Sequence, residues 1–393
     1  MSTQIAPNVV TWADDLDQET IRQASNVASL PFVKHPVAVM ADGHLGYGVP
    51  IGTVLPTKGA IIPSAIGVDI GCGMIAVETI FKSTSLPDDL SSLHDAIRQA
   101  VPAGMGQGHE DTSGNSKRDR RWHRFTRGLD SPPMDVGLSN TAFKQFGSLG
   151  GGNHFVEVCL DEADQVWIVL HSGSRGVGNK LAQRHIDQAK GLTLEKLTDP
   201  DLAYLTEGTP EFDAYIKAML WAQAYAMENR QVMMDNVLLA FTEFLGFLPS
   251  LSVEMDRINC HHNFTEQENH NGETVWLTRK GAVKADKGDR GIIPGSMGTA
   301  TYIVEGLGNP ASYNSSSHGA GRKMSRGKAR KNLDLDGLRE QMSGQAWNEA
   351  EAEQLLDEDP RAYKDIHQVM VNQADLVKTT HVLNSVLNYK GVK

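Results

Sequence analysis

Glycine is concentrated in one N-terminal stretch of the chain, where eight of the 31 residues from Gly43 to Gly73 are glycines. Short runs of valine and isoleucine separate these glycines, and the preceding run Val37–Met40 is typical of a buried strand. Because glycine adopts backbone conformations that other residues rarely adopt, the segment can turn sharply between strands. The pattern predicts short strands whose connecting turns build a site rather than a spacer.

Helical patterns occupy most of the remaining chain. Residues 17–31 start with a capping aspartate and stop at a proline, and residues 87–101 have a similar amphipathic spacing. Longer helices are expected at 181–190 and from about 211 to 245, an acidic helix at 347–359, and a final helix after it. We therefore expect a mixed α/β (α+β) fold, with helices packed outside mixed sheets of short strands.

The formal net charge of −11 over 393 residues excludes a protein that coats nucleic acid with its whole surface. A polyanion would have to be met locally, and residues 322–331 contain six lysines or arginines. The polar segment 103–135 carries a second basic group. Its composition favours a mobile solvated loop, with an arm that contacts a nucleic-acid backbone as the functional alternative.

Three cysteines, Cys72, Cys159 and Cys260, lie far apart in the sequence. The N-terminus lacks the charged and apolar regions of a secretory signal, and there is no apolar run of 18 residues. An odd cysteine count in such a chain argues against a disulfide framework. We expect a cytoplasmic protein without a membrane segment, whose reduced thiols are available to metal.

Potential metal ligands occur at strand ends and glycine turns. Asp69 and Cys72 are three residues apart across a glycine, His154 follows a glycine run, and His171 ends an apolar strand. His261 and His262 are also candidates. Adjacent side chains of an extended segment face opposite ways, so at most one of these two histidines joins the group. A carboxylate, a thiol and imidazoles favour a catalytic Mn²⁺, Zn²⁺ or Fe²⁺ site over a structural zinc site.

His318 is the candidate nucleophile. It lies between three serines and a Gly-Ala-Gly run, so that little bulk blocks its ring. A neutral imidazole can attack phosphorus when its other nitrogen is held by a hydrogen bond. The glycine turns at 150–153 and 294–298 could wrap phosphates, and together these features favour metal-assisted phosphoryl or nucleotidyl transfer.

Seven blocks of this sequence, in the same order from about Met40 to Lys390, resemble the signature blocks of the RtcB family of RNA-splicing ligases. They are VDIGCGM at 68–74, GGNHFVE at 151–157, HSGSRG at 171–176, CHHN at 260–263, RKGA at 279–282, PGSMG at 294–298 and SHGAGRKMSR at 317–326. The resemblance implies a GTP-dependent enzyme that joins an RNA 3′-phosphate or 2′,3′-cyclic phosphate end to a 5′-hydroxyl end, in RNA splicing or repair. Thr301 departs from the serine expected near the nucleotide, and residues 103–135 and those near 350 match no block.

Carried over position by position, the resemblance implies four groups of site residues. His318 would take GMP from GTP. A pair of Mn²⁺ ions would be held by Asp69, Cys72, His154, His171 and His262. GTP would be surrounded by Asn153, Phe155, Glu157, Asn263, Pro294, Gly295, Ser296, Met297, Thr301, Gly319, Ala320, Gly321 and Lys390. RNA phosphates would be gripped by Arg175, Lys280, Arg322 and Arg326.

The implied mechanism has three steps: His318 is guanylylated, GMP passes to the RNA 3′-phosphate, and the 5′-hydroxyl displaces GMP. RNA with these ends is the expected partner, with an activating protein as a second candidate. Residues spread from Asp69 to His318 predict one catalytic domain over 1–393. A nucleotide-independent phosphoesterase that opens cyclic phosphates would need the metal ligands but not Glu157 or Lys390, and a non-catalytic RNA-end binder would need no nucleophile.

Overall fold

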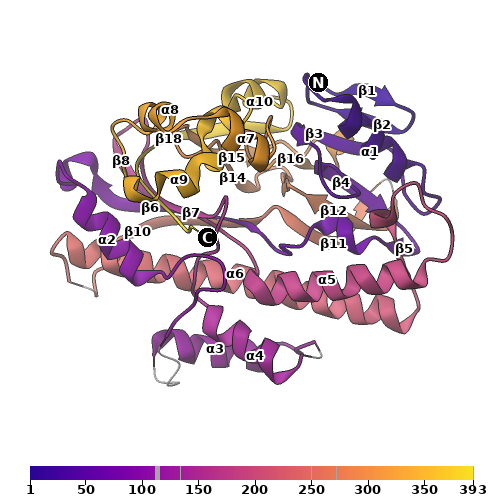
Figure 1. Ribbon diagram of the computed structural model, residues 1–393, viewed down its shortest axis with the longest axis horizontal. Helices are drawn as coiled ribbons and strands as arrows, with labels where there is room; N and C mark the ends of the chain where they lie inside the picture. Colours follow the sequence, from indigo (N-terminus) through magenta and orange to yellow (C-terminus); the bar gives the residue numbers. More distant parts are fainter. Residues whose placement is uncertain (111–115, 133, 249, 271, 393) are drawn as a thin grey trace.

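The computed structural model describes residues 1–110, 116–132, 134–248, 250–270 and 272–392 (Figure 1). Two large sheets of short strands occupy the upper part of the view, and long helices run across below them. The expected mixed α+β fold is confirmed. No helix in the described part of the chain combines the length and the apolar character needed to cross a membrane.

The first sheet has six strands and contains the predicted glycine-rich segment. Its order is β1 (Thr3–Ala6), β2 (Val9–Thr11), β3 (Val37–His44), β4 (Ile51–Thr57), β12 (Glu273–Lys280) and β11 (Asn263–His270). Helix α1 (Gln18–Ala28) packs on it with Asp17 as its N-cap, as the sequence predicts. The sheet pairs the N-terminal strand β4 with β12, so it brings the N-terminal glycine turns beside residues near 280.

The second sheet curls into a nearly closed barrel. Its order is β10 (Glu254–His261), β6 (Gly73–Lys82), β8 (Gln165–Ser172), β7 (Phe155–Leu160), β18 (Val377–Lys390), β15 (Thr301–Gly306) and β14 (Arg290–Pro294), with β17 (Ala346–Trp347) beside β18. The edge strands meet where the Cys260 thiol of β10 accepts a hydrogen bond from the Ile292 backbone of β14. Met74, Trp167 and Leu383 fill the interior of the barrel.

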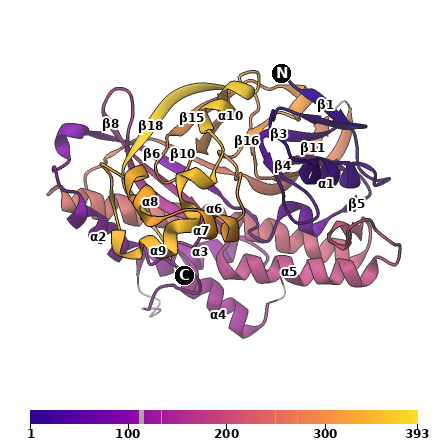
Figure 2. The same cartoon turned by 45° about the horizontal axis from the view of Figure 1, so that its top comes forward.

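Helices cover the outer face of the barrel and the lower side of the molecule. Helix α6 (Pro210–Phe244) and helix α2 (Ser91–Ala100) pack on the barrel, where Met233 and Phe241 join the valines and isoleucines of its strands. Helix α5 (Arg175–Leu192) lies alongside α6 in both views (Figures 1 and 2). These long helices match the predicted helices at 181–190 and 211–245.

The remaining elements are short. They are β5 (Ala60–Ile61), β9 (Leu205–Thr206), β13 (Ala282–Lys284), β16 (Ser315–Ser317), α7 (Arg326–Asn332), α8 (Leu335–Gln341), the predicted final helix α10 (Ile366–Asn372), and single turns of 3₁₀ helix at 63–66, 83–85, 200–202, 310–312, 349–351, 356–358 and 360–362. Strand β16 pairs with β13 and ends at Ser317, directly before His318.

The expectation of a mobile loop over the basic segment is wrong for residues 117–128, which form helix α3 (Lys117–Gly128). Ser116 and Asp119 cap its first turn reciprocally, and the Trp122 ring contacts Phe125 of the same helix and Phe143, Phe146 and Tyr225 of other segments. Helix α4 (Val136–Gln145) follows it. A few aromatic contacts order this polar segment. Residues 111–115 and 133, which the expected loop also included, lie outside the described residues.

The predicted acidic helix at 347–359 is also wrong in extent. The segment breaks into short turns around α9 (Ala352–Leu355). The reason is that Asp357, Glu358 and Asp359 are buried and bind arginines, instead of lying on a solvated helix face. A buried carboxylate needs a partner, and the partners here lie outside the segment.

Candidate active site

Five side chains from separate parts of the chain converge at one end of the barrel. Cys72 Sγ lies 3.4 Å from His154 Nε2 and 3.3 Å from His171 Nε2. His171 Nε2 lies 3.2 Å from His262 Nε2, and His154 Nε2 lies 3.1 Å from Asp69 Oδ2. The five predicted ligands therefore point their donor atoms at a shared space.

Strand register produces this convergence. Phe155 of β7 pairs with His171 of β8, and Gly73 of β6 pairs with both Ser172 of β8 and His261 of β10. Residues just before, at or just after these positions come from four neighbouring strands at the same end of the sheet. His261 itself turns away and bonds the Gly71 carbonyl with its Nδ1, so only one histidine of the pair joins the group.

Two glycines make room for the ligands. A Cβ atom on Gly173 would lie 2.2 Å from a carboxylate oxygen of Asp69, and one on Gly150 would lie 2.1 Å from His154 Nδ1. Both distances are shorter than any ordinary contact of a side chain. Gly173 and Gly150 are therefore required by the packing of the Asp69 and His154 side chains.

The imidazoles of His171 and His262 are in the form that binds a metal. Burial and neighbouring histidines lower the pKa of both His171 and His262 well below the ordinary value, so both rings are neutral. His171 Nδ1 lies 3.1 Å from the Asn153 carbonyl, which accepts the ring proton at that nitrogen. This tautomer leaves the Nε2 lone pair directed at the shared space, as in protein metal sites.

The carboxylate and the thiol complete the donor set. Burial opposes ionisation of Asp69, but the adjacent His154 and the Ser174 backbone N–H outweigh it and lower its pKa to about 2. Burial and the Asp69 charge raise the pKa of the Cys72 thiol, which a bound metal would deprotonate. Nitrogen, sulfur and oxygen donors around one space fit a catalytic transition metal.

His318 lies next to this group. Its ring centroid is 4.9 Å from that of His262, and its Nδ1 is 2.6 Å from Oδ2 of the fully buried Asp42. Asp42 also accepts the backbone N–H groups of His318 and Gly319, each at 3.2 Å. Despite burial, the adjacent His318 lowers the pKa of Asp42. Nε2 is thus the ring atom available for attack.

Asp42 was missed by the sequence reasoning. It follows the buried strand that was predicted at Val37–Met40, but its partner lies 276 residues away. An aspartate beside a glycine is usually a turn residue, so the local pattern alone could not assign it.

Two cavities meet at His318. The larger, about 470 Å³, is lined by Asp69, Cys72 and His262 from the metal-ligand group, and by Lys280. The smaller is about 250 Å³. Residues 318–322, the loop 294–297, Phe155, Arg326, Glu358, Tyr363 and Lys390 line the smaller cavity. Asn153 and His318 line both, and the predicted metal ligand His171 lines the smaller one, so His318 faces both spaces.

The structure separates some residues that the resemblance groups around GTP. Asn263 lines the larger cavity, and Glu157 and Thr301 line neither of these two. Glu157 is buried in the barrel, where Asn388 donates a hydrogen bond of 2.6 Å to it, and burial raises its pKa to about 8. The other ten predicted GTP residues line the smaller cavity.

The four predicted RNA contacts differ in their surroundings. Arg322 and Arg326 line the smaller cavity. Lys280 lines the larger one, donates to backbone carbonyls at 2.8 and 3.2 Å, and has its pKa lowered by burial to about 7. Arg175 is buried and donates to the Ser148 hydroxyl and to two backbone carbonyls. These roles remain predictions.

Glu358 is a second residue that the sequence reasoning missed. Its carboxylate lies 3.3 Å from Lys390 Nζ, also pairs with Arg326, and accepts a hydrogen bond of 2.7 Å from the Tyr363 hydroxyl. Burial opposes its ionisation, but Lys390 and Arg326 lower its pKa to about 2. An acidic run such as 357–359 is usually solvated, which hid this residue.

A ring of metal-binding donors beside a carboxylate-held histidine is typical of a metal-assisted group-transfer centre. The chain belongs to the RtcB family, because the family model described as "tRNA-splicing ligase RtcB" matches residues 23–391. It is 45% identical to the RNA-splicing ligase RtcB of Escherichia coli K12, over 100% of this chain and 99% of that protein. It is 31% identical to the tRNA-splicing ligase RtcB of Nanoarchaeum equitans, over 93% of this chain and 88% of that protein.

Proposed function

We propose that this protein joins RNA ends that carry a 3′-phosphate or 2′,3′-cyclic phosphate to ends that carry a 5′-hydroxyl, with GTP as co-substrate and Mn²⁺ as metal, in the cytoplasm. The observation that carries the proposal is His318, held by Asp42 between a group of metal ligands and a second cavity. The names of the relatives support RNA as the substrate. An activating protein stays a predicted second partner.

In this proposal Asp69, Cys72, His154, His171 and His262 hold a pair of Mn²⁺ ions. When bound, the ions would neutralise phosphate oxygens and align leaving groups. The lowered pKa values of the buried histidines support this role, because neutral imidazoles bind metal without first losing a proton.

His318 is proposed to attack the α-phosphorus of GTP through Nε2, with pyrophosphate as the leaving group. Asp42 keeps the proton on Nδ1 and stabilises the positive charge that develops on the ring. A 2′,3′-cyclic phosphate is first opened by water, which leaves a 3′-phosphate and a free 2′-hydroxyl. An oxygen of the RNA 3′-phosphate then attacks the same α-phosphorus, and the bond to His318 Nε2 breaks. The 5′-hydroxyl oxygen finally attacks the activated 3′-phosphate, and GMP leaves as the new phosphodiester forms.

The two cavities give each substrate a place. We assign GTP to the smaller one, where backbone groups of residues 294–297 and 319–321 line the wall together with Lys390. The RNA ends are assigned to the larger one, because it is lined by metal ligands and Lys280. His318 then reaches the nucleotide from one side and the RNA from the other.

A ligation assay tests the proposal. RNA fragments with a 3′-phosphate and a 5′-hydroxyl are incubated with Mn²⁺, with and without GTP, and with the native chain or His318→Ala. We expect a joined product only with GTP and the native histidine. Opening of a cyclic phosphate without GTP, and without joining, would instead indicate the phosphoesterase.

A further inference from the structure

Helix α3 is fixed to the molecule by one of its faces. Trp122 packs against Tyr225 of α6, and Arg121 pairs with Glu228 and Asp235 of the same helix. Arg118 is also buried, 2.6 Å from Asp119. Arg118 and Arg121 therefore bind the protein itself.

The opposite face of α3 is exposed and basic. Its exposed residues Lys117, Arg120, His123, Arg124 and Arg127 follow helical spacing, and the last four alone line a depression of about 460 Å³. Positions three, four and seven residues apart lie on one side of a helix, so these side chains form a continuous stripe. A helix of 12 residues is about 18 Å long, which is enough to run along several phosphate groups.

Within the part of the chain that the structure describes, no ion pair joins Lys117, Arg124 or Arg127 to a carboxylate. Asp119, the acidic residue of the helix, is buried on Arg118. Asp130 lies 3.6 Å from Lys217, and α4 adds Lys144 and no carboxylate. On a chain with net charge −11, a local basic stripe of this kind is unusual.

The helix is linked to the segment that builds the site. His109 Nε2 bonds the Gly147 carbonyl, and a Cβ atom on Gly147 would lie 3.7 Å from the Arg118 side chain. Gly147 opens the glycine run that ends at Asn153 and His154, two residues of the candidate site. In Figures 1 and 2 α3 and α4 lie on the far side of α6 from most of the sheets.

We propose that the exposed face of α3, with Lys117, His123, Arg124 and Arg127, is a second RNA-binding surface that holds the sugar-phosphate backbone of the substrate away from the ends being joined. This inference rests on the proposed function. Arginine forks match phosphate oxygens, and phosphate contacts position a nucleic acid without reading its sequence. The surface selects long or structured RNA over short fragments.

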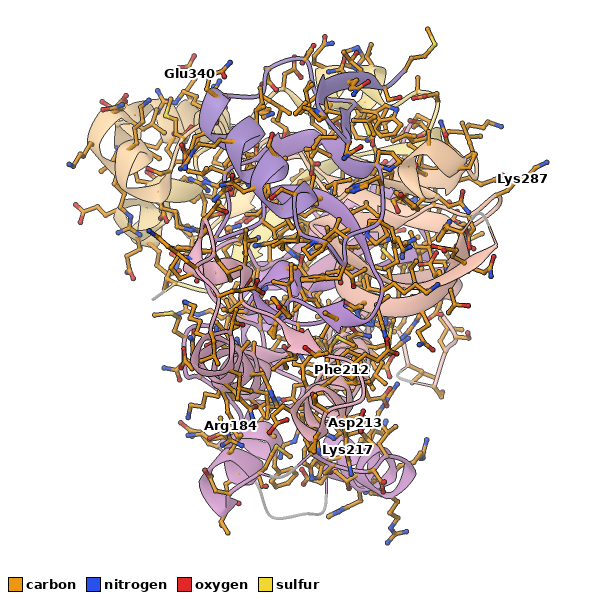
Figure 3. All side chains as sticks on the ribbon, turned by 90° about the vertical axis from the view of Figure 1, so that its right-hand side faces the viewer. Arg184, Phe212, Asp213, Lys217, Lys287 and Glu340 are labelled. Atoms are coloured by element: carbon orange, nitrogen blue, oxygen red, sulfur yellow. The ribbon has the colours of Figure 1, made fainter. Side chains whose placement is uncertain are left out.

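The test uses the full chain with Arg124→Glu and Arg127→Glu together, and a second variant with Gln at both positions. The matched control carries Lys287→Glu and Lys378→Glu, which changes the net charge equally. Both control lysines are exposed, and Lys287 lies toward the opposite end of the molecule from α3 (Figure 3). Each protein is assayed for His318 guanylylation, for ligation of fragments of a few nucleotides, and for affinity to long RNA at several salt concentrations.

We expect the Glu variant to bind long RNA about tenfold more weakly, with the slope of log affinity against log salt reduced by roughly 1.5, the value for two lost phosphate contacts. The Gln variant should show a smaller loss in the same direction. Guanylylation and short-fragment ligation should stay at the native level in both.

Unchanged affinity for long RNA would overturn the inference and leave an acidic protein as the partner that this face fits. An equal loss in the lysine control, or an equal loss with short fragments, would also overturn it, since neither depends on α3 contacts. Failure of the native chain to form guanylylated His318 would instead contradict the proposed function. The two failures are therefore distinguishable.

Discussion

The two sides of His318 are built from different kinds of groups. On one side, Cys72 and His262 are buried without charge, and His171, which also lines the smaller cavity, lies 3.2–3.3 Å from each of them. On the other side, Arg326 and Lys390 are charged, and each already has the Glu358 carboxylate as its partner.

This difference indicates how each side meets its ligand. The first side is an arrangement of lone pairs that a cation completes, so a metal can bind with little change in the protein. The second side has its cations neutralised, so a polyanion must compete with Glu358 for them. We infer that, apart from His171, metal binding and nucleotide binding depend on separate residues, and the following variants test that separation.

Loss of a metal ligand should have the largest effect. Cys72→Ala removes an atom that is proposed to bind the metal directly. Loss of a residue that only hydrogen-bonds a metal ligand costs about 10- to 100-fold in metal affinity. We therefore expect metal affinity to fall at least this much and ligation to become undetectable. Elemental analysis after a chelator wash measures the bound Mn²⁺. Cys159→Ala, at a buried thiol inside the barrel, is the matched control and should keep its metal. Equal retention by both variants would contradict the ligand assignment.

Removal of the charge that holds the nucleophile should come next. Asp42→Asn keeps the shape of the side chain but no longer fixes the proton on His318 Nδ1. We expect the rate of guanylylation to fall about 10²- to 10⁴-fold, as for other histidines that lose their carboxylate. Rapid-quench measurements with saturating GTP give this rate. Metal content should not change, and a native rate would remove Asp42 from the mechanism.

Lys390→Met should affect the nucleotide side alone. A hydrogen bond to a charged group contributes roughly 1.5–3 kcal/mol, so we expect the Kd for GTP to rise about tenfold or more while bound Mn²⁺ stays constant. Lys378→Met, an exposed lysine on the same strand, is the control. Parallel loss of metal and GTP in Lys390→Met would break the proposed separation of the two sides.

Glu157 should have the smallest effect on activity and a clear effect on stability. Its folded pKa of about 8 lies above the unfolded value near 4.5, so the folded state holds a proton that the unfolded state has lost between these pH values. The native free energy of unfolding should therefore fall with rising pH relative to Glu157→Gln. We expect a difference of roughly 3 kcal/mol at pH 7 that vanishes near pH 4.5. Urea unfolding at pH 5 and pH 8 measures it, and a pH-independent difference would show that Glu157 is ionised when folded.

Much of the metal side could be predicted from sequence, because its residues sit at strand ends next to glycines. His154, His171 and His262 each mark such a position, and period-two alternation predicted that at most one histidine of the pair at 261–262 joins the group. The long helices could also be predicted, from their apolar spacing.

The nucleotide side could not be assembled in this way. Strand β18 inserts between β7 and β15, and its pairing shifts register near Ser385, so no regular alternation marks it in the sequence. The partner of Asp42, His318, lies 276 residues away in the chain. Glu358 lies in an acidic run that looks solvated. Pairing between distant charged groups is a property of tertiary packing and leaves no local pattern.

The central claim is that His318 carries GMP. The most direct measurement incubates the native chain, His318→Ala and Asp42→Asn with Mn²⁺ and GTP labelled on the α-phosphate, followed by a denaturing gel. We expect a label on the native chain that survives denaturation, is lost in acid as a phosphoramidate, is weak in Asp42→Asn and is absent from His318→Ala. Label of native strength on His318→Ala, or no label on the metal-loaded native chain, would contradict it.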